Sequence, residues 1–224
     1  MINKVAITGH SSGIGLACFD LLDLTCNGAE IKGYSKSNGW NIADSGGDKI
    51  IQELIDFDPD ILINNAYYPE IQTKILKDLF EEWRTKEKKI INIGSISSYM
   101  AGILPPDQYI TCKEEQRNFI VRNSFVDGVQ TKCQLYNLSF SFVATPLLTK
   151  SSHHRETSTM VQLEDAALAV LDCIDDGLEQ GYRTVERVIQ CHQISLEEME
   201  ANWRTGARNM AKHIIRTNND LKSQ

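Results

Sequence analysis

The sequence has 224 residues, of which 42% are hydrophobic and 24% are charged, and 23 basic against 30 acidic residues give a net charge of −7. This length fits one domain, or at most a domain and a half, and the composition excludes a disordered chain. The acidic balance lacks the basic footprint of a nucleic-acid-binding protein, and no apolar run reaches the roughly 20 residues that span a bilayer. We therefore expect a soluble protein with neither a nucleic-acid nor a membrane partner.

Strand-like runs alternate with helical segments along the whole chain. The expected strands are residues 5–8, 31–34, 60–64, 89–93, 133–140 and 184–189, and the expected helices are residues 13–26, 48–57, 72–85, 107–125 and 163–174. This alternation predicts a single α/β domain with a doubly wound parallel sheet and helices on both faces. The domain would cover residues 1–194, and residues 195–224 would form a polar helical tail of the same domain.

The six cysteines lie at positions 18, 26, 112, 133, 173 and 191, and no two of them have the spacing C-x-x-C. We therefore expect reduced thiols, no zinc ribbon and no redox dithiol. Cys191 and His192 have no partner at ligand spacing, so no metal site is predicted. The sequence passes from Met1 almost directly into the first strand, which predicts no signal peptide and a cytoplasmic location.

A glycine-rich turn joins the first strand to the first helix, with the sequence Thr8-Gly9-His10-Ser11-Ser12-Gly13-Ile14-Gly15. Glycines let the backbone turn tightly and approach a pyrophosphate, and the helix N-terminus offers unpaired N–H groups. The spacing T-G-x-x-x-G-x-G resembles the cofactor fingerprint of classical short-chain dehydrogenases/reductases. The resemblance implies a Rossmann-type fold, a nicotinamide cofactor and a small carbonyl or alcohol substrate, on which the protein would act as an oxidoreductase.

The catalytic group of that family is matched by Tyr109 and Lys113, which form Y-x-x-x-K. Residues four apart share a helix face, and an ammonium near a phenol lowers its pKa, so Tyr109 would act as general acid or base. By resemblance, Lys113 also holds the nicotinamide ribose. Ser95, in a strand similar to I-V-N-I-S-S, would orient the substrate oxygen. This alignment needs one inserted residue around Pro105 and Pro106, and Ser97 is the alternative.

Two further segments resemble family positions that contact the cofactor. Asn64-Asn65-Ala66 is similar to N-N-A-G, with Tyr67 in place of the glycine. Residues 140–146 are similar to a segment that meets the nicotinamide, with Thr145 at the position that contacts the carboxamide. Phe140 and Ser141 replace the usual proline and glycine. The ring of Phe140 is expected either to cover one face of the nicotinamide or to pack in the core.

The choice of cofactor is made at the end of the second strand, where an acidic residue would repel the 2′-phosphate of NADP. Ser35 and Lys36 stand there instead, and a hydroxyl with an ammonium suits a phosphate. The sequence therefore predicts NADP(H), with NAD(H) less favoured, although Lys36 could also be an ordinary solvated lysine. Asn41 and Ile42 resemble the family's adenine-contacting D-V pair.

The chain also departs from the family. Only 29 residues lie between Asn65 and Ser95, and the shortened stretch would carry the asparagine that completes the family's catalytic tetrad through a bound water. We find no residue for that role. The alternative function is therefore an NADP-binding sensor or regulatory protein with little or no turnover. That alternative is favoured by Tyr67, by Phe140 with Ser141, and by the missing asparagine.

Assembly is expected to differ from the family as well, because family members usually pair through two long helices. The first is shortened here, and the second carries Glu114, Glu115, Gln116 and Arg117 after Lys113. Burying carboxylates at a two-fold interface is costly. We therefore expect a monomer or a non-standard homo-oligomer, with the tail of residues 195–224 as one candidate interface. The polar loop of residues 149–159 has no assigned role.

Overall fold

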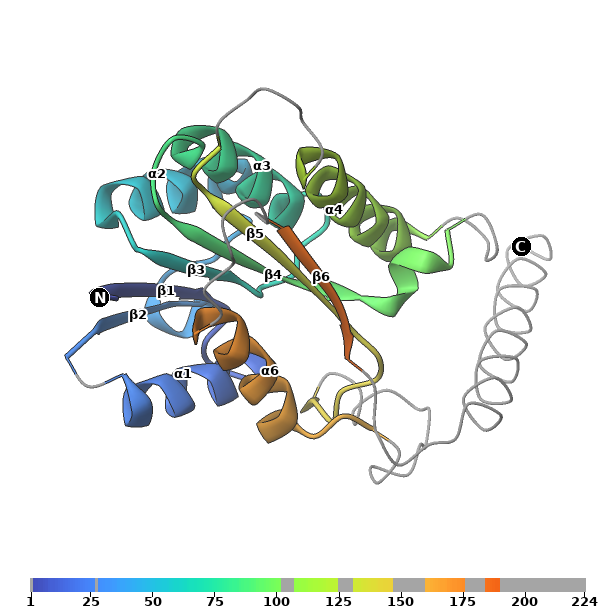
Figure 1. Ribbon diagram of the computed structural model, residues 1–224, viewed down its shortest axis with the longest axis horizontal. Coiled ribbons are helices and arrows are strands. Elements are labelled where there is room, and N and C mark those ends of the chain that lie inside the picture. Colours follow the sequence, from blue (N-terminus) through green and yellow to red (C-terminus); the bar gives the residue numbers. More distant parts are fainter. Residues whose placement is uncertain are drawn as a thin grey trace, which may run out of the picture.

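The computed structural model describes residues 2–26, 28–101, 107–124, 131–146, 160–175 and 184–189. Six strands form one parallel sheet in the order β2-β1-β3-β4-β5-β6 (Figure 1). Their bounds are β1 Lys4–Thr8, β2 Glu30–Tyr34, β3 Ile61–Asn64, β4 Lys89–Ser95, β5 Gln134–Phe140 and β6 Thr184–Ile189. Each strand lies within two residues of its predicted position, and the predicted doubly wound fold is confirmed.

Helices cover both faces of the sheet, as Figure 1 shows. One face carries α1 (Gly13–Thr25) and α6 (Leu163–Asp175), which contact each other. The opposite face carries α2 (Asp48–Phe57), α3 (Ile71–Trp83) and α4 (Gln108–Ser124). No helix in these described ranges is long and apolar enough to cross a membrane.

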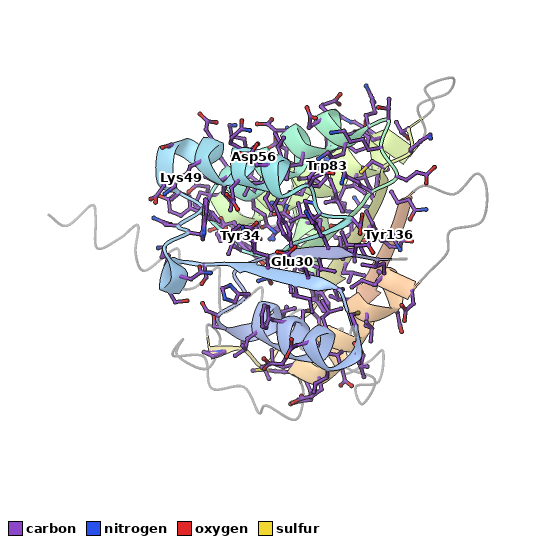
Figure 2. All side chains as sticks on the ribbon, turned by 90° about the vertical axis from the view of Figure 1, so that its left-hand side faces the viewer. Glu30, Tyr34, Lys49, Asp56, Trp83 and Tyr136 are labelled. Carbon is purple, nitrogen blue, oxygen red and sulfur yellow. The ribbon has the colours of Figure 1, made fainter. Side chains whose placement is uncertain are left out.

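The sheet separates two hydrophobic cores, because successive side chains of a strand point to opposite faces. Val5 and Ile7 of β1 belong to the core under α1 and α6, whereas Ala6 belongs to the core under α2, α3 and α4. Tyr34 and Trp83, both fully buried, lie in the second core (Figure 2). Burial on both faces explains why the strands read as nearly continuous apolar runs.

The strand order reverses between β1 and β3. The chain leaves β1 to form β2 on one side and returns to form β3 on the other side. In open parallel sheets, ligands bind at the carboxyl ends of the strands, at this topological switch point. The glycine turn follows β1 and the segment Asn64–Tyr67 follows β3, so the fold brings these two predicted cofactor segments to the same place.

Several predicted features lie outside the described residues. They are Pro105 and Pro106, the loop of residues 149–159, Cys191 with His192, and the tail of residues 195–224.

Candidate cofactor site and active site

The turn after β1 adopts a conformation that its glycines make possible. Gly9 has φ +73° and Gly13 has φ +56°, values that other residues rarely adopt. A Cβ on Gly15 would lie 2.3 Å from the backbone oxygen of Gly9, so any side chain there would clash with the turn. Ile14 is buried against the core, whereas Ser11 and Ser12 are exposed. The turn therefore leaves polar groups and backbone accessible at the start of α1.

Hydrogen bonds join this turn to the segment after β3. The backbone N–H groups of Asn65 and Ala66 donate to Thr8 Oγ1 at 2.9 and 3.0 Å, and Asn65 Nδ2 donates to Thr8 O at 3.0 Å. A Cβ on Gly9 would lie 2.9 Å from Asn65 Nδ2. Thr8, Gly9, Asn65 and Ala66 thus form one packed unit.

His10 packs across the turn onto the second strand. A Cβ on Gly33 would lie 2.1 Å from the His10 ring, so the glycine in β2 makes room for the imidazole. The ring of Phe19 lies 5.4 Å away on α1. His10 Nδ1 is buried and has no hydrogen-bond partner among the described residues, which is a feature expected where a polar ligand binds.

The end of β2 lies beside the turn, because Gly9 N donates to Tyr34 O at 2.6 Å. Ser35 is buried, with its Oγ 2.7 Å from Ser37 Oγ, whereas Lys36 is exposed. Lys36 is therefore the accessible cation of the predicted phosphate-binding pair.

Asn41 and Ile42 lie in a loop that is stabilised from within. Asn41 Nδ2 donates to Asp44 Oδ1 at 2.9 Å, and Asn41 Oδ1 accepts from the backbone N–H of Ala43 at 3.3 Å. Ile42 is buried in the core under α2. A carbonyl oxygen has two lone pairs, and the contact of Asn41 Oδ1 with adenine stays a prediction.

The segment after β5 reaches the glycine turn through Thr145. If Gly13 had a Cβ, that atom would lie 3.3 Å from Thr145 Cγ2. Phe140 is 3% exposed and belongs to the core under α1 and α6, together with Val143. Of the two positions expected for Phe140, the structure shows the core position. The contact of Thr145 with the carboxamide stays a prediction.

Ser95, Tyr109 and Lys113 come together at the carboxyl end of β4. Ser95 ends that strand, and α4 carries the other two residues one turn apart. The Ser95 hydroxyl hydrogen-bonds the Tyr109 phenol, and this bond lowers the pKa of Tyr109. Ser95 Oγ also lies 3.1 Å from Ser97 Oγ. The contact with Tyr109 favours Ser95 over Ser97 as the substrate-orienting serine.

The electrostatics of this cluster differ from the sequence prediction. Burial is the dominant influence on Tyr109 and raises the pKa of its phenol, against the smaller effect of Ser95. Lys113 Nζ donates to Gln72 Oε1 and to Ile93 O, both at 2.7 Å, and lies 5.6 Å from the centre of the Tyr109 ring. Burial lowers the pKa of Lys113 to about 7. The predicted lowering of the Tyr109 pKa by Lys113 is therefore not seen.

Tyr67, which replaces the family's glycine, lies directly against this cluster. Its ring is 4.9 Å from the Tyr109 ring, at 76° to it, and Lys113 Nζ lies 5.5 Å from its centre. The side chain is partly exposed, and burial raises the pKa of its phenol to about 12. Tyr67 therefore covers the lysine and one side of the tyrosine.

Sequence reasoning missed Gln72, which the structure places next to Lys113. A signal that could have pointed to this region is the row of asparagines inside apolar strands, at matched register positions in β3, β4 and β5. Asn92 Nδ2 donates to Asn137 Oδ1 at 3.0 Å and to Gln116 Oε1 at 3.1 Å, while Asn64 Nδ2 donates to Asn92 Oδ1 at 3.1 Å. This buried polar network extends under α3 and α4.

Gln116 is not on the outer face of α4. From the sequence alone, it is grouped with Glu114, Glu115 and Arg117 at the helix surface through which family members pair. It is fully buried, because its amide completes the network. On the outer face, Glu115 pairs with Lys77 of α3 at 2.5 Å. Within the described residues, no group of histidine, cysteine, aspartate and glutamate side chains could hold a metal ion.

No protein-family model matches the sequence, and no curated protein matches it either. Solved structures do match the fold. The 3-alpha-hydroxysteroid dehydrogenase from Pseudomonas sp. B-0831, complexed with NADH, has a TM-score of 0.67 and 18% identity, over 84% of this chain and 95% of that one. A short chain dehydrogenase from Burkholderia cenocepacia J2315, in complex with NADP, has a TM-score of 0.63 and 14% identity, over 84% and 96%.

A third similar structure is a blue fluorescent protein from a metagenomic library, in complex with NADPH, with a TM-score of 0.64 and 16% identity over 86% and 98% of the two chains. The chain has the fold of the short-chain dehydrogenases/reductases. The matches extend over 95%, 96% and 98% of the lengths of these three proteins.

Proposed function

We propose that this protein is a nicotinamide-dependent oxidoreductase of the short-chain dehydrogenase/reductase type, acting on a carbonyl or alcohol group. The observation that carries the proposal is the convergence of two features at one sheet edge. One is the glycine turn, in which a side chain at Gly15 would clash with the backbone oxygen of Gly9. The other is the contact between Ser95 and Tyr109 beside Lys113. A mere structural turn would not require the second feature.

The residues present fit a dinucleotide. The accessible start of α1 suits a pyrophosphate, and the unpartnered His10 Nδ1 lies in the same turn. Asn41 would face the adenine, Asn65 and Ala66 the ribose, and Thr145 the carboxamide, whereas the buried side chains of Ile42 and Asn64 support these segments from the interior. When bound, the nicotinamide supplies or accepts a hydride. The protein itself excludes water and orients the substrate.

In the direction of reduction, Ser95 donates a hydrogen bond to the substrate oxygen and fixes the carbonyl carbon towards the cofactor site. Tyr109 then passes its phenolic proton to the same oxygen as negative charge develops there. A raised pKa keeps this proton on Tyr109 at neutral pH, which suits a general acid. In oxidation, the same two groups act in reverse.

We further propose that the cofactor is NADP(H) rather than NAD(H). The exposed Lys36 and the neighbouring Ser35 stand where an acidic residue would repel the 2′-phosphate. The cytoplasmic location and the expected monomer or non-standard homo-oligomer stay predictions.

Thermal-shift titration with NADPH, NADP, NADH and NAD tests the cofactor directly, because a ligand that binds only the native state raises the melting temperature. We expect the largest shift with NADPH or NADP. In calorimetry, Lys36→Ala should narrow the difference in affinity between NADPH and NADH by about 1–2 kcal/mol, the scale of a charge-assisted hydrogen bond. Lys86→Ala is the control, because Lys86 pairs with Glu82 and lies between the end of α3 and the start of β4, away from the carboxyl ends of the strands. Equal affinities of the wild-type protein for NADPH and NADH would refute the preference.

The second candidate is an NADP-binding sensor or regulatory protein with little turnover, and the position of Tyr67 over Lys113 and Tyr109 favours it. Tyr67→Gly restores the family residue and separates the two candidates. A sensor would bind NADPH but oxidise it with no member of a panel of aldehydes and ketones, before or after the substitution. An enzyme would turn over at least one compound, and Tyr67→Phe, which keeps the ring, serves as the control.

A further inference from the structure

Gln72 occupies the first turn of α3 and has no exposed surface, although it is polar. Both ends of its amide are used. Its Nε2 donates to Asn64 O at 2.8 Å and to Ile93 O at 3.3 Å. Its Oε1 accepts from Lys113 Nζ at 2.7 Å and from Gln116 Nε2 at 3.4 Å. The orientation of the amide is therefore determined by β3, β4 and α4 together.

This fixed amide determines where the amine of Lys113 lies. Nζ has two acceptors at 2.7 Å, Gln72 Oε1 and the backbone oxygen of Ile93. Ile93 is two residues before Ser95 in β4, so one acceptor belongs to the strand that ends in the substrate-orienting serine. A lysine side chain has many rotamers, and two rigid acceptors select one of them.

The charged and titratable groups around Lys113 are few. Tyr109 and Cys112 lie on its own helix, and Tyr67 lies after β3. Gln72 on α3 and the Ile93 carbonyl on β4 carry no charge. Among the described residues, no carboxylate contacts Nζ of Lys113. The neighbour that holds this amine is therefore an amide that cannot titrate.

We propose that Gln72 is the positioning residue for Lys113 and holds Nζ directly beside Tyr109, where the amine would bind the nicotinamide ribose. The inference rests on the proposed function, since it assigns Gln72 a part in the same site. In this chain, a direct contact from a short α3 replaces the water-linked asparagine that the family resemblance implies. Gln72 touches neither substrate nor reacting atoms and acts through Lys113.

The first test follows the titration of Lys113 itself in the cofactor-free protein. Lysine labelled with ¹³C at Cε gives an NMR signal whose shift reports protonation, and loss of one signal in Lys113→Met assigns it. Gln72→Glu places a carboxylate against Nζ, so the titration midpoint of Lys113 should rise by at least one pH unit. Thr73→Val is the matched control, because Thr73 Oγ1 accepts from Gln116 in the same network without touching Lys113.

The second test measures NADPH affinity by calorimetry. Gln72→Leu should weaken binding about 5- to 10-fold, the scale of one net hydrogen bond, whereas Thr73→Val should leave it within twofold. Gln72→Asn, one methylene shorter, should lie between wild type and Gln72→Leu. If Gln72→Leu does not fold, the comparison of Gln72→Glu with Thr73→Val decides.

The two proposals fail in distinguishable ways. Wild-type protein that binds no nicotinamide nucleotide would overturn the proposed function, whatever Lys113 does. A folded Gln72→Glu protein whose Lys113 titrates as in the wild type would overturn the role of Gln72, even if NADPH binds. An equal loss of NADPH affinity in Thr73→Val and Gln72→Leu would also overturn it, because it would show a general effect of the network.

Discussion

Gly15→Ala tests whether the glycine turn has the tight geometry on which cofactor binding depends. In an unconstrained helix, alanine is more stable than glycine by about 1 kcal/mol. Here the new Cβ would lie 2.3 Å from Gly9 O and 2.6 Å from Asn65 Nδ2. Overpacking of this kind costs about 1–3 kcal/mol. Displacement of Asn65 would also weaken its bond to Thr8 O, at about 0.5–1.5 kcal/mol net. We therefore expect a net destabilisation of about 1–3 kcal/mol.

The measurement is urea unfolding of the wild-type and variant proteins, followed by circular dichroism and analysed by linear extrapolation. Asp20→Ala, an exposed substitution in the same helix, is the control and should leave the protein equally stable or slightly more stable. NADPH affinity should fall together with stability in Gly15→Ala, because the turn would have to open. A variant that is more stable than the wild type and binds NADPH normally would refute the geometry of the turn.

Three further predictions concern the active site and assembly. Tyr109→Phe should leave NADPH binding nearly unchanged and reduce carbonyl reduction by at least ~100-fold, as measured by NADPH consumption, and normal turnover would disprove its role as general acid. Lys113 has a folded-state pKa of about 7, below its unfolded value, so the unfolded chain binds the extra proton and the free energy of unfolding should rise by about 1.6 kcal/mol from pH 7 to 8.5. This rise should be lost in Lys113→Met. If the free energy of unfolding has the same pH dependence in the wild-type and Lys113→Met proteins, the burial of the amine is contradicted. Light scattering after size exclusion should show a monomer or a dimer, and a tetramer built on the outer face of α3 and α4 would contradict the argument from its charged residues.

The strands could be predicted because strands buried on both faces have continuous hydrophobic sequences. Residues 61–63 and 90–91 are runs of isoleucine and leucine, as expected for central parallel strands. The helix α2 has its apolar residues on one face, and they are the ones that the sheet buries. Local pattern and global packing agree in these elements, so little beyond the sequence was needed.

The glycine turn was predictable for a similar reason, because its requirements are local. Gly9 and Gly13 need positive φ values, and Gly15 needs space beside Gly9, all within eight residues. The role of Gln72 was not predictable in this way. Its partner Lys113 is 41 residues away, and only the tertiary arrangement of α3 and α4 brings them together.

The pKa of Tyr109 shows a second limit of sequence reasoning. Spacing alone places Lys113 on the same helix face, and a nearby ammonium lowers the pKa of a phenol. Spacing does not reveal that the amine donates to Gln72 and Ile93, or how far burial disfavours charge on both groups. In the structure, desolvation raises the pKa of Tyr109 and lowers that of Lys113.

The cover that Tyr67 forms over Lys113 does not by itself prevent catalysis, because its contacts are weak compared with dinucleotide binding. An aromatic pair contributes about 0.5–1.5 kcal/mol and a cation–π contact about 0.5–2 kcal/mol. Micromolar binding corresponds to about 8 kcal/mol, so a cofactor can displace the ring and still bind. The bonds from Lys113 to Gln72 and Ile93 can persist while the ring moves, because neither acceptor belongs to the segment of Tyr67. The structure thus combines a Lys113 amine held by two hydrogen bonds with a Tyr67 ring held by weak contacts. The free energy needed to move the ring would reduce the affinity for the cofactor and not the rate of the catalytic step.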